Sequence, residues 1–78
     1  MQKIIGGKLY DTEKAELICR IKNIRYVRDY YRTNKGTFFC HYVTVGKMEL
    51  INENVIKDIL AEVDVNKYID LFGDVAEG

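Results

Sequence analysis

Four side chains in this chain of 78 residues are the candidates for catalysis or metal binding: Cys19, Asp29, Cys40 and His41. His41 is the only histidine, and imidazole exchanges protons near neutral pH, so it would be the general base. An aspartate–histidine pair across two strands is more often structural. Cys40 and His41 are adjacent in a predicted strand, where successive side chains point to opposite faces. No cysteine or histidine spacing typical of a zinc site occurs. We therefore predict a non-enzymatic protein without a metal or a cofactor.

A second group of side chains is suited to binding. Tyrosine and arginine alternate along one stretch, which we predict to contact a partner: Tyr26, Arg28, Tyr30, Arg32, Lys35 and Tyr42. Both types are enriched at the hot spots of protein interfaces. The same types stack on the bases of single strands and attract phosphates. In a third interpretation the rings form a second core face, with the arginine stems packed over them.

The formal net charge of zero conceals an asymmetry along the chain. Residues 1–35 contain nine Lys or Arg and four Asp or Glu, whereas residues 36–78 contain three and eight. Carboxylates on a rigid frame can occupy a basic groove on a partner. The second half therefore offers an alternative partner-binding surface, made of Glu49, Glu53, Asp58, Glu62 and Asp64. In the simplest interpretation the two halves pack together and neutralise each other.

The alternating stretch is predicted to be a β-hairpin within residues 24–45. Its turn is Thr33-Asn34-Lys35-Gly36-Thr37, where a glycine in the third loop position suits a left-handed backbone. On this register Tyr31 faces Phe39 and Asp29 faces His41.

Period 2 separates the hairpin into two faces. We predict that the helices pack on the odd-numbered face, which contains Val27, Tyr31, Phe39, Val43 and Val45. The even-numbered face, with its rings and guanidinium groups, would then be open to a partner.

The chain before the hairpin predicts a short hairpin and a helix. Gly6-Gly7 can form the tight turn of a hairpin over residues 3–10. Asp11-Thr12 can cap a helix over residues 12–22, which would end at Asn23. Its apolar stripe would be Ala15, Ile18, Cys19 and Ile21.

The chain after the hairpin predicts one strand and two helices. Residues 48–51 form the strand, and apolar residues then recur at helical spacing over 53–63 and over 65–72. The capping residues are Asn52 and Asp64. Gly73 is suited to ending the second helix.

These elements make a single α+β domain over residues 1–73. We expect a small antiparallel sheet, in the order ββα-βββ-αα, with helices packed on one face and a frayed tail over residues 74–78. Apolar residues form 47% of the chain, which argues against disorder. No apolar run approaches the ~18 residues of a membrane span, so no membrane contact is expected. Reduced cysteines favour the cytoplasm, and an exposed sheet edge could join two copies in a homodimer.

Three segments together resemble a family of small proteins from Gram-positive bacteria, their phages and their mobile elements. The segments are KIIGGKLYDTE at 3–13, YRTNKGTFF at 31–39 and IKDILAE at 56–62, followed by Tyr68 and by LFG at 71–73. Where proteins of that family have a glycine-rich stretch, this chain has residues 40–46 instead.

The resemblance implies a setting and a function. Phage proteins of this size often bind and block host machinery. We therefore expect a phage or mobile-element protein that inhibits or modulates a host protein or nucleoprotein complex, for example a CRISPR or other defence effector in the bacterial cytoplasm. The alternative is a small DNA- or RNA-binding accessory protein that uses the tyrosine–arginine face.

Overall fold

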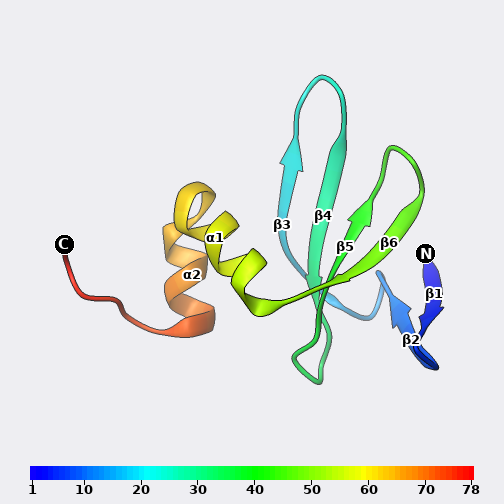
Figure 1. Cartoon of the computed structure of the whole chain (residues 1–78), viewed down its shortest axis with the longest axis horizontal. Coiled ribbons are helices and arrows are strands. Elements are labelled where there is room, and N and C mark those ends of the chain that lie inside the picture. The colour runs from blue at the N-terminus through cyan, green and yellow to red at the C-terminus, as the bar shows by residue number, and fades with distance from the viewer.

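The computed structural model contains two antiparallel sheets and two helices (Figure 1). The elements in chain order are β1 (Gln2–Ile5), β2 (Lys8–Asp11), β3 (Glu16–Lys22), β4 (Val27–Arg32), β5 (Phe38–Tyr42), β6 (Lys47–Ile51), α1 (Glu53–Val63) and α2 (Val65–Phe72). β1 and β2 form a two-stranded hairpin, and β3 to β6 form a four-stranded sheet in sequence order. The predicted α+β class is confirmed. Neither helix has the length and apolar character needed to cross a bilayer.

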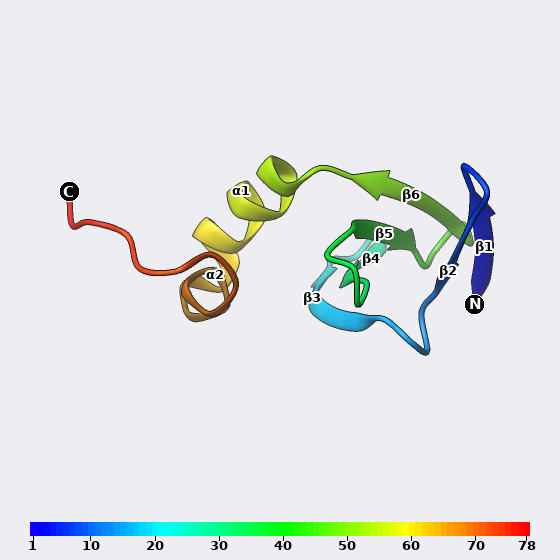
Figure 2. The ribbon, with the colours of Figure 1, turned by 90° about the horizontal axis from the view of Figure 1, so that it is seen from below.

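The elements are arranged in three layers. Figure 2 shows α1 and α2 on one side of the four-stranded sheet and the β1–β2 hairpin on the other. A separate hydrophobic cluster fills each of the two interfaces. The sheet is therefore covered on parts of both faces.

The helices pack on the even-numbered face of the β4–β5 hairpin, so the prediction that they cover the odd-numbered face is wrong. Ile56 and Leu60 of α1 are 0% exposed, and they lie in one cluster with Tyr30, Phe38 and Cys40. The two α1 residues are four positions apart, so they project from the same side of the helix.

The odd-numbered face is covered by the N-terminal hairpin instead. Tyr10 of β2 lies in a cluster with Tyr31, Phe39 and Met48. The Tyr31 and Phe39 rings stack with centroids 5.0 Å apart, and the Tyr10 ring meets Phe39 edge-on at 5.6 Å. This aromatic contact fixes the hairpin against the sheet.

The prediction of a helix over residues 12–22 is also wrong, because the chain forms β3 there. Asp11 accepts hydrogen bonds from the Glu13 amide through Oδ1 at 2.9 Å and from the Ala15 amide through its carbonyl at 3.0 Å. This makes a single turn before β3 begins. The register against β4 then shifts between Leu17 and Cys19, which leaves Ile18 as an extra residue. The shift breaks the period-2 pattern and makes the apolar spacing look helical.

The predicted β4–β5 hairpin is confirmed. Tyr31 pairs with Phe39, and Asp29 pairs with His41. Gly36 has a positive φ of 86°, and the Thr33 amide donates to the Thr37 carbonyl at 2.8 Å across the turn.

The predicted β6 strand and both C-terminal helices are confirmed as well. Asn52 caps α1 by accepting from the Val55 amide, and Asp64 caps α2 by accepting from the Lys67 amide. Gly73 ends α2 with φ of 92°. Residues 74–78 have no regular secondary structure.

Candidate functional site

Three of the predicted binding residues form a cluster at one end of the sheet. The Arg28 guanidinium lies 4.2 Å from the centroid of the Tyr26 ring and 5.3 Å from that of Tyr42. These distances are within the range of cation–π attraction. Ile24, at the tip of the β3–β4 hairpin, is 100% exposed. We call these four residues the arm surface.

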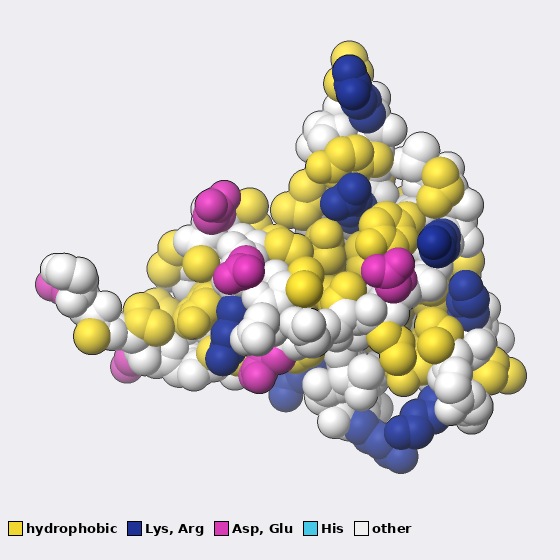
Figure 3. Space-filling view, in the orientation of Figure 1, with side chains coloured by type: hydrophobic (Ala, Val, Ile, Leu, Met, Phe, Trp, Pro, Cys, Tyr) yellow, Lys and Arg dark blue, Asp and Glu magenta, His cyan; other side chains and the backbone are white.

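The β3–β4 hairpin extends farther than the β5–β6 hairpin beside it (Figure 1). Lysine and arginine side chains lie among hydrophobic ones along this hairpin, while most acidic side chains in the same view lie over the helices (Figure 3). On this face, the charge asymmetry of the sequence therefore becomes a partial separation in space.

Asn23 stabilises the turn at the tip of the β3–β4 hairpin. Its Oδ1 accepts from the Arg25 amide at 2.8 Å and from the Tyr26 amide at 3.1 Å, and its own amide donates to the Tyr26 carbonyl at 3.0 Å. The sequence predicted that Asn23 ends a helix. In the structure its side chain instead stabilises a tight turn between two strands. The turn leaves Ile24 in solvent.

The β5–β6 turn is tied to β4, and this places Tyr42 beside Arg28. The Val27 amide donates to Thr44 Oγ1 at 2.9 Å, and the Val43 amide donates to the Val27 carbonyl at 2.9 Å. Arg28 and Tyr42 are direct cross-strand partners. Two strands, β4 and β5, and the β5–β6 turn thereby hold Tyr42 against Arg28.

The environment of Arg28 favours the charged guanidinium but leaves one of its hydrogen-bond donors without a partner. The Tyr30 hydroxyl group beside it is the main cause that raises the pKa of Arg28 above its ordinary value, against the opposing effect of desolvation. Arg28 Nε is buried and has no hydrogen-bond partner. An orphaned buried donor costs about 1–3 kcal/mol. Such costs within a folded protein are typical of functional positions.

The other predicted hairpin residues lie outside the exposed arm surface, and only the buried Tyr30 reaches it, through its hydroxyl group beside Arg28. Tyr30 is buried in the cluster beneath α1. Arg32 borders a small cleft beside Glu53 and Phe72. Lys35 lies in the β4–β5 turn, at the opposite end of the strands. The alternating sequence pattern therefore corresponds to three different environments.

The acidic residues are exposed but dispersed. Glu49 pairs with Cys40 across β5 and β6, Glu53 is in the first turn of α1, and the Asp64 carboxylate is used to cap α2. Asp58 and Glu62 lie one turn apart on α1. Glu53, Asp58 and Glu62 present free carboxylates on α1, whereas Glu49 and Asp64 lie elsewhere, so the acidic alternative has a smaller surface than the sequence suggests.

Of the residues with catalytic types, Asp29 is engaged by Arg20, and both cysteine thiols are shifted away from the reactive thiolate form. Asp29 is 3% exposed, and its two oxygens accept from Arg20 Nε at 2.6 Å and Nη2 at 2.8 Å. Desolvation raises the pKa of Cys19 to about 11 and also raises that of Cys40. No three His, Cys, Asp or Glu side chains gather in the geometry of a metal site.

Sequence reasoning did not single out Ile24, which the structure leaves fully exposed at the tip of the β3–β4 hairpin. A fully exposed isoleucine is expected to contribute binding energy because large apolar side chains gain most from leaving water. The sequence signal was Asn23-Ile24-Arg25, which reads as a hairpin turn once residues 16–22 are recognised as a strand.

Nothing among family models, curated proteins or solved structures matches this chain. The resemblance to phage and mobile-element proteins therefore stays a prediction. β3 and β6 are the edges of the four-stranded sheet, so pairing of two copies through an edge also stays a prediction.

Proposed function

We propose that this chain is a non-enzymatic binding protein that docks its arm surface on a host protein and thereby inhibits or modulates it. The observation that carries the proposal is the Arg28 guanidinium between the Tyr26 and Tyr42 rings, next to the exposed Ile24. A rigid arginine flanked by aromatic rings and an apolar anchor has the composition of an interface hot spot.

The surface suits a partner with an apolar pocket beside a carboxylate. Ile24 enters the pocket, and the two rings exclude water around Arg28. A carboxylate that reaches the open end of the guanidinium then makes charge-assisted hydrogen bonds in a poorly hydrated environment, where such bonds are strong.

A protein partner fits this geometry better than a nucleic acid does. Nucleobase stacking requires free ring faces. The guanidinium of Arg28 already lies over faces of Tyr26 and Tyr42, and Tyr30 is buried. The zero net charge also gives little general attraction to a polyanion.

The resemblance to phage and mobile-element proteins supports a bacterial host protein or nucleoprotein complex as the target. A CRISPR or other defence effector is the candidate to test first, because small proteins of such elements often block host defence. In this proposal the protein acts in the cytoplasm of the host.

Capture from a host lysate tests the proposal with matched charge changes. The wild-type protein is expected to enrich one host protein that Ile24→Asp and Arg28→Glu no longer enrich. The control Asp58→Lys/Glu62→Lys changes charge on α1 and is expected to retain that protein. If Asp58→Lys/Glu62→Lys no longer captures the host protein and Arg28→Glu still does, the interface lies on the acidic helix α1 and not on the arm surface.

A second measurement separates the nucleic-acid alternative. Binding of a single-stranded or duplex oligonucleotide to the purified protein is followed by fluorescence anisotropy over a range of salt concentrations. The proposal expects no salt-dependent binding at the arm surface. Tight binding that weakens steeply with salt and is lost in Arg28→Glu would favour the accessory nucleic-acid-binding function.

A further inference from the structure

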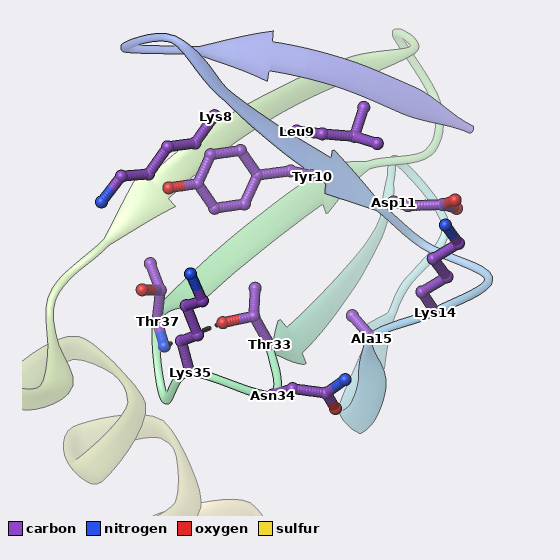
Figure 4. A pocket seen from close by; sticks show the side chains of 10 residues that line it. All are labelled: Lys8, Leu9, Tyr10, Asp11, Lys14, Ala15, Thr33, Asn34, Lys35 and Thr37. Atoms are coloured by element: carbon purple, nitrogen blue, oxygen red, sulfur yellow. Dashed lines mark hydrogen bonds between the residues drawn. The ribbon is translucent and has the colours of Figure 1, made fainter.

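A groove of about 550 Å³ lies at the end of the sheet opposite the arm surface. It is enclosed by β2, by the turn before β3 and by the β4–β5 turn (Figure 4). Its volume is within the ~300–1,000 Å³ range of small-molecule sites. The groove exists because the aromatic contacts of Tyr10 hold the N-terminal hairpin over the sheet.

Positive charge converges on this groove from three separate segments. Lys8, Lys14 and Lys35 line it, and Asp11 is its only carboxylate. Neither ion pair of the chain, Arg20–Asp29 and Glu16–Lys67, involves a groove lysine. The groove therefore has an excess of ammonium groups in a protein whose net charge is zero.

The excess is concentrated at one end. The Lys14 side chain extends toward the Asp11 end of the groove, whereas Lys8 and Lys35 extend toward the other end (Figure 4). Asp11 is further engaged by Gln2 Nε2 at 3.0 Å and by the Glu13 amide at 2.9 Å, and these contacts lower its pKa. Lys8 and Lys35 are left without a carboxylate partner.

Tyr10 contributes a hydroxyl group at the end of the groove where Lys8 and Lys35 lie (Figure 4). The residue is 5% exposed because its ring packs on Phe39, but its hydroxyl points to the same end of the groove as Lys8 (Figure 4). This hydroxyl has no hydrogen-bond partner within the chain. A phenol held by a buried ring is a fixed donor that loses little entropy when it binds a ligand.

The opposite wall is also ordered. Thr33 Oγ1 accepts from the Thr37 amide at 3.1 Å, and the Thr33 carbonyl accepts from the Gly36 amide at 2.9 Å. These bonds fix the loop that contains Lys35. Lys35 is therefore presented by an ordered turn, and Lys8, which pairs with Ile5 in the N-terminal hairpin, lies on the facing wall (Figure 4).

From this arrangement we propose that the groove binds a small phosphate monoester, whose phosphate lies between Lys8, Lys35 and the Tyr10 hydroxyl. Two ammonium groups and a neutral donor match the charge and the several acceptor oxygens of a phosphate dianion. The body of the ligand extends along Ala15 and Asn34 toward the Lys14–Asp11 end. The site lies apart from the arm surface, so it is a second function of the same fold.

NMR titration with adenosine monophosphate, inorganic phosphate and adenosine tests the proposal. In ¹H–¹⁵N spectra, adenosine monophosphate is expected to shift the amides of residues 8–15 and 33–37 in a saturable manner. Inorganic phosphate should shift a subset of them, and adenosine should bind much more weakly. Added salt should weaken the binding.

Single substitutions then locate the phosphate. Tyr10→Phe keeps the ring on Phe39 and removes only the hydroxyl, so a loss of affinity of about tenfold is expected for adenosine monophosphate. Lys8→Gln and Lys35→Gln should each weaken binding by about the same factor. The matched control Lys47→Gln removes an exposed lysine of β6, outside the groove, and should leave the affinity unchanged.

Several results would overturn the proposal. These are the absence of a saturable shift, equal binding of adenosine and adenosine monophosphate, or unchanged affinity in all three groove variants. Much tighter binding of a thymidine dodecamer, with shifts that extend from the groove across the sheet, would instead assign the groove to a nucleic-acid chain.

Discussion

Replacing Arg28 with methionine separates the structural from the functional contribution of this side chain. Methionine preserves an unbranched apolar stem between Tyr26 and Tyr42 and removes the guanidinium. If Arg28 serves to bind a partner, the folded protein should tolerate the change while binding is lost.

The geometry gives the expected magnitude. Cation–π contacts at 4.2 and 5.3 Å from the two ring centroids contribute about 1–2 kcal/mol together. The same substitution removes the buried Nε that lacks a partner, and this relieves a cost of about 1–3 kcal/mol. The two effects oppose each other, so Arg28→Met should lower the free energy of unfolding by no more than about 1 kcal/mol.

Urea denaturation followed by far-ultraviolet circular dichroism measures this difference, since the chain contains no tryptophan. Arg28→Lys is the control that keeps the charge but changes its shape, and it should bind the partner more weakly than wild type. A destabilisation of Arg28→Met by more than ~2 kcal/mol would refute the reasoning, because Arg28 would then be a structural residue.

Three further predictions concern the fold. Leu60→Ala should destabilise the protein by about 2–5 kcal/mol in the same denaturation assay, while the exposed control Val55→Ala should cost less than ~1 kcal/mol. Similar losses in the two variants would contradict the packing of α1 on the even-numbered face. With a pKa of about 11 against an ordinary 9.0, Cys19 at pH 8 should react with a disulfide reagent about a hundredfold more slowly than a free thiol, and fast labelling would contradict the partial burial of this thiol. The lowered pKa of Asp11 means that this carboxylate stabilises the fold above about pH 4 and that its contribution is lost as the pH falls through the folded-state pKa. Asp11→Asn should therefore show a shallower loss of stability on acidification, and an unchanged acid profile would count against the contacts of this side chain.

Local signals in the sequence predict the parts of the fold that depend on neighbouring residues. Gly36 defined the β4–β5 turn and therefore the register on both sides of it. Asn52 and Asp64 located the starts of both helices because their side chains satisfy free amides of the first turn.

The errors arose where distant residues decide the outcome. Asp11 does cap a turn, but pairing with β4 and the extra residue Ile18 convert the following segment to a strand. The apolar odd-numbered face was expected to pack against the helices, yet it packs against Tyr10. On the same face, Asp29 is buried because it pairs with Arg20, which lies nine residues earlier in the chain. Contacts of this kind are not encoded in local periodicity.

The candidate site shows the same division. The cluster of Tyr26, Arg28 and Tyr42 follows from strand register alone, so the sequence predicts it. The basic groove depends on how the N-terminal hairpin sits relative to the β4–β5 turn, and no spacing in the sequence signals that placement.

Site-specific photo-crosslinking in host cells tests the central claim most directly. A photoreactive residue replaces Ile24, which is fully exposed and whose replacement should not disturb the fold, or Glu62 on α1 as the control. The account predicts that position 24 crosslinks to one host protein, that position 62 does not, and that Arg28→Glu abolishes the crosslink. Crosslinks from position 62 alone, or from position 24 only to nucleic acid, would contradict a protein-binding arm surface.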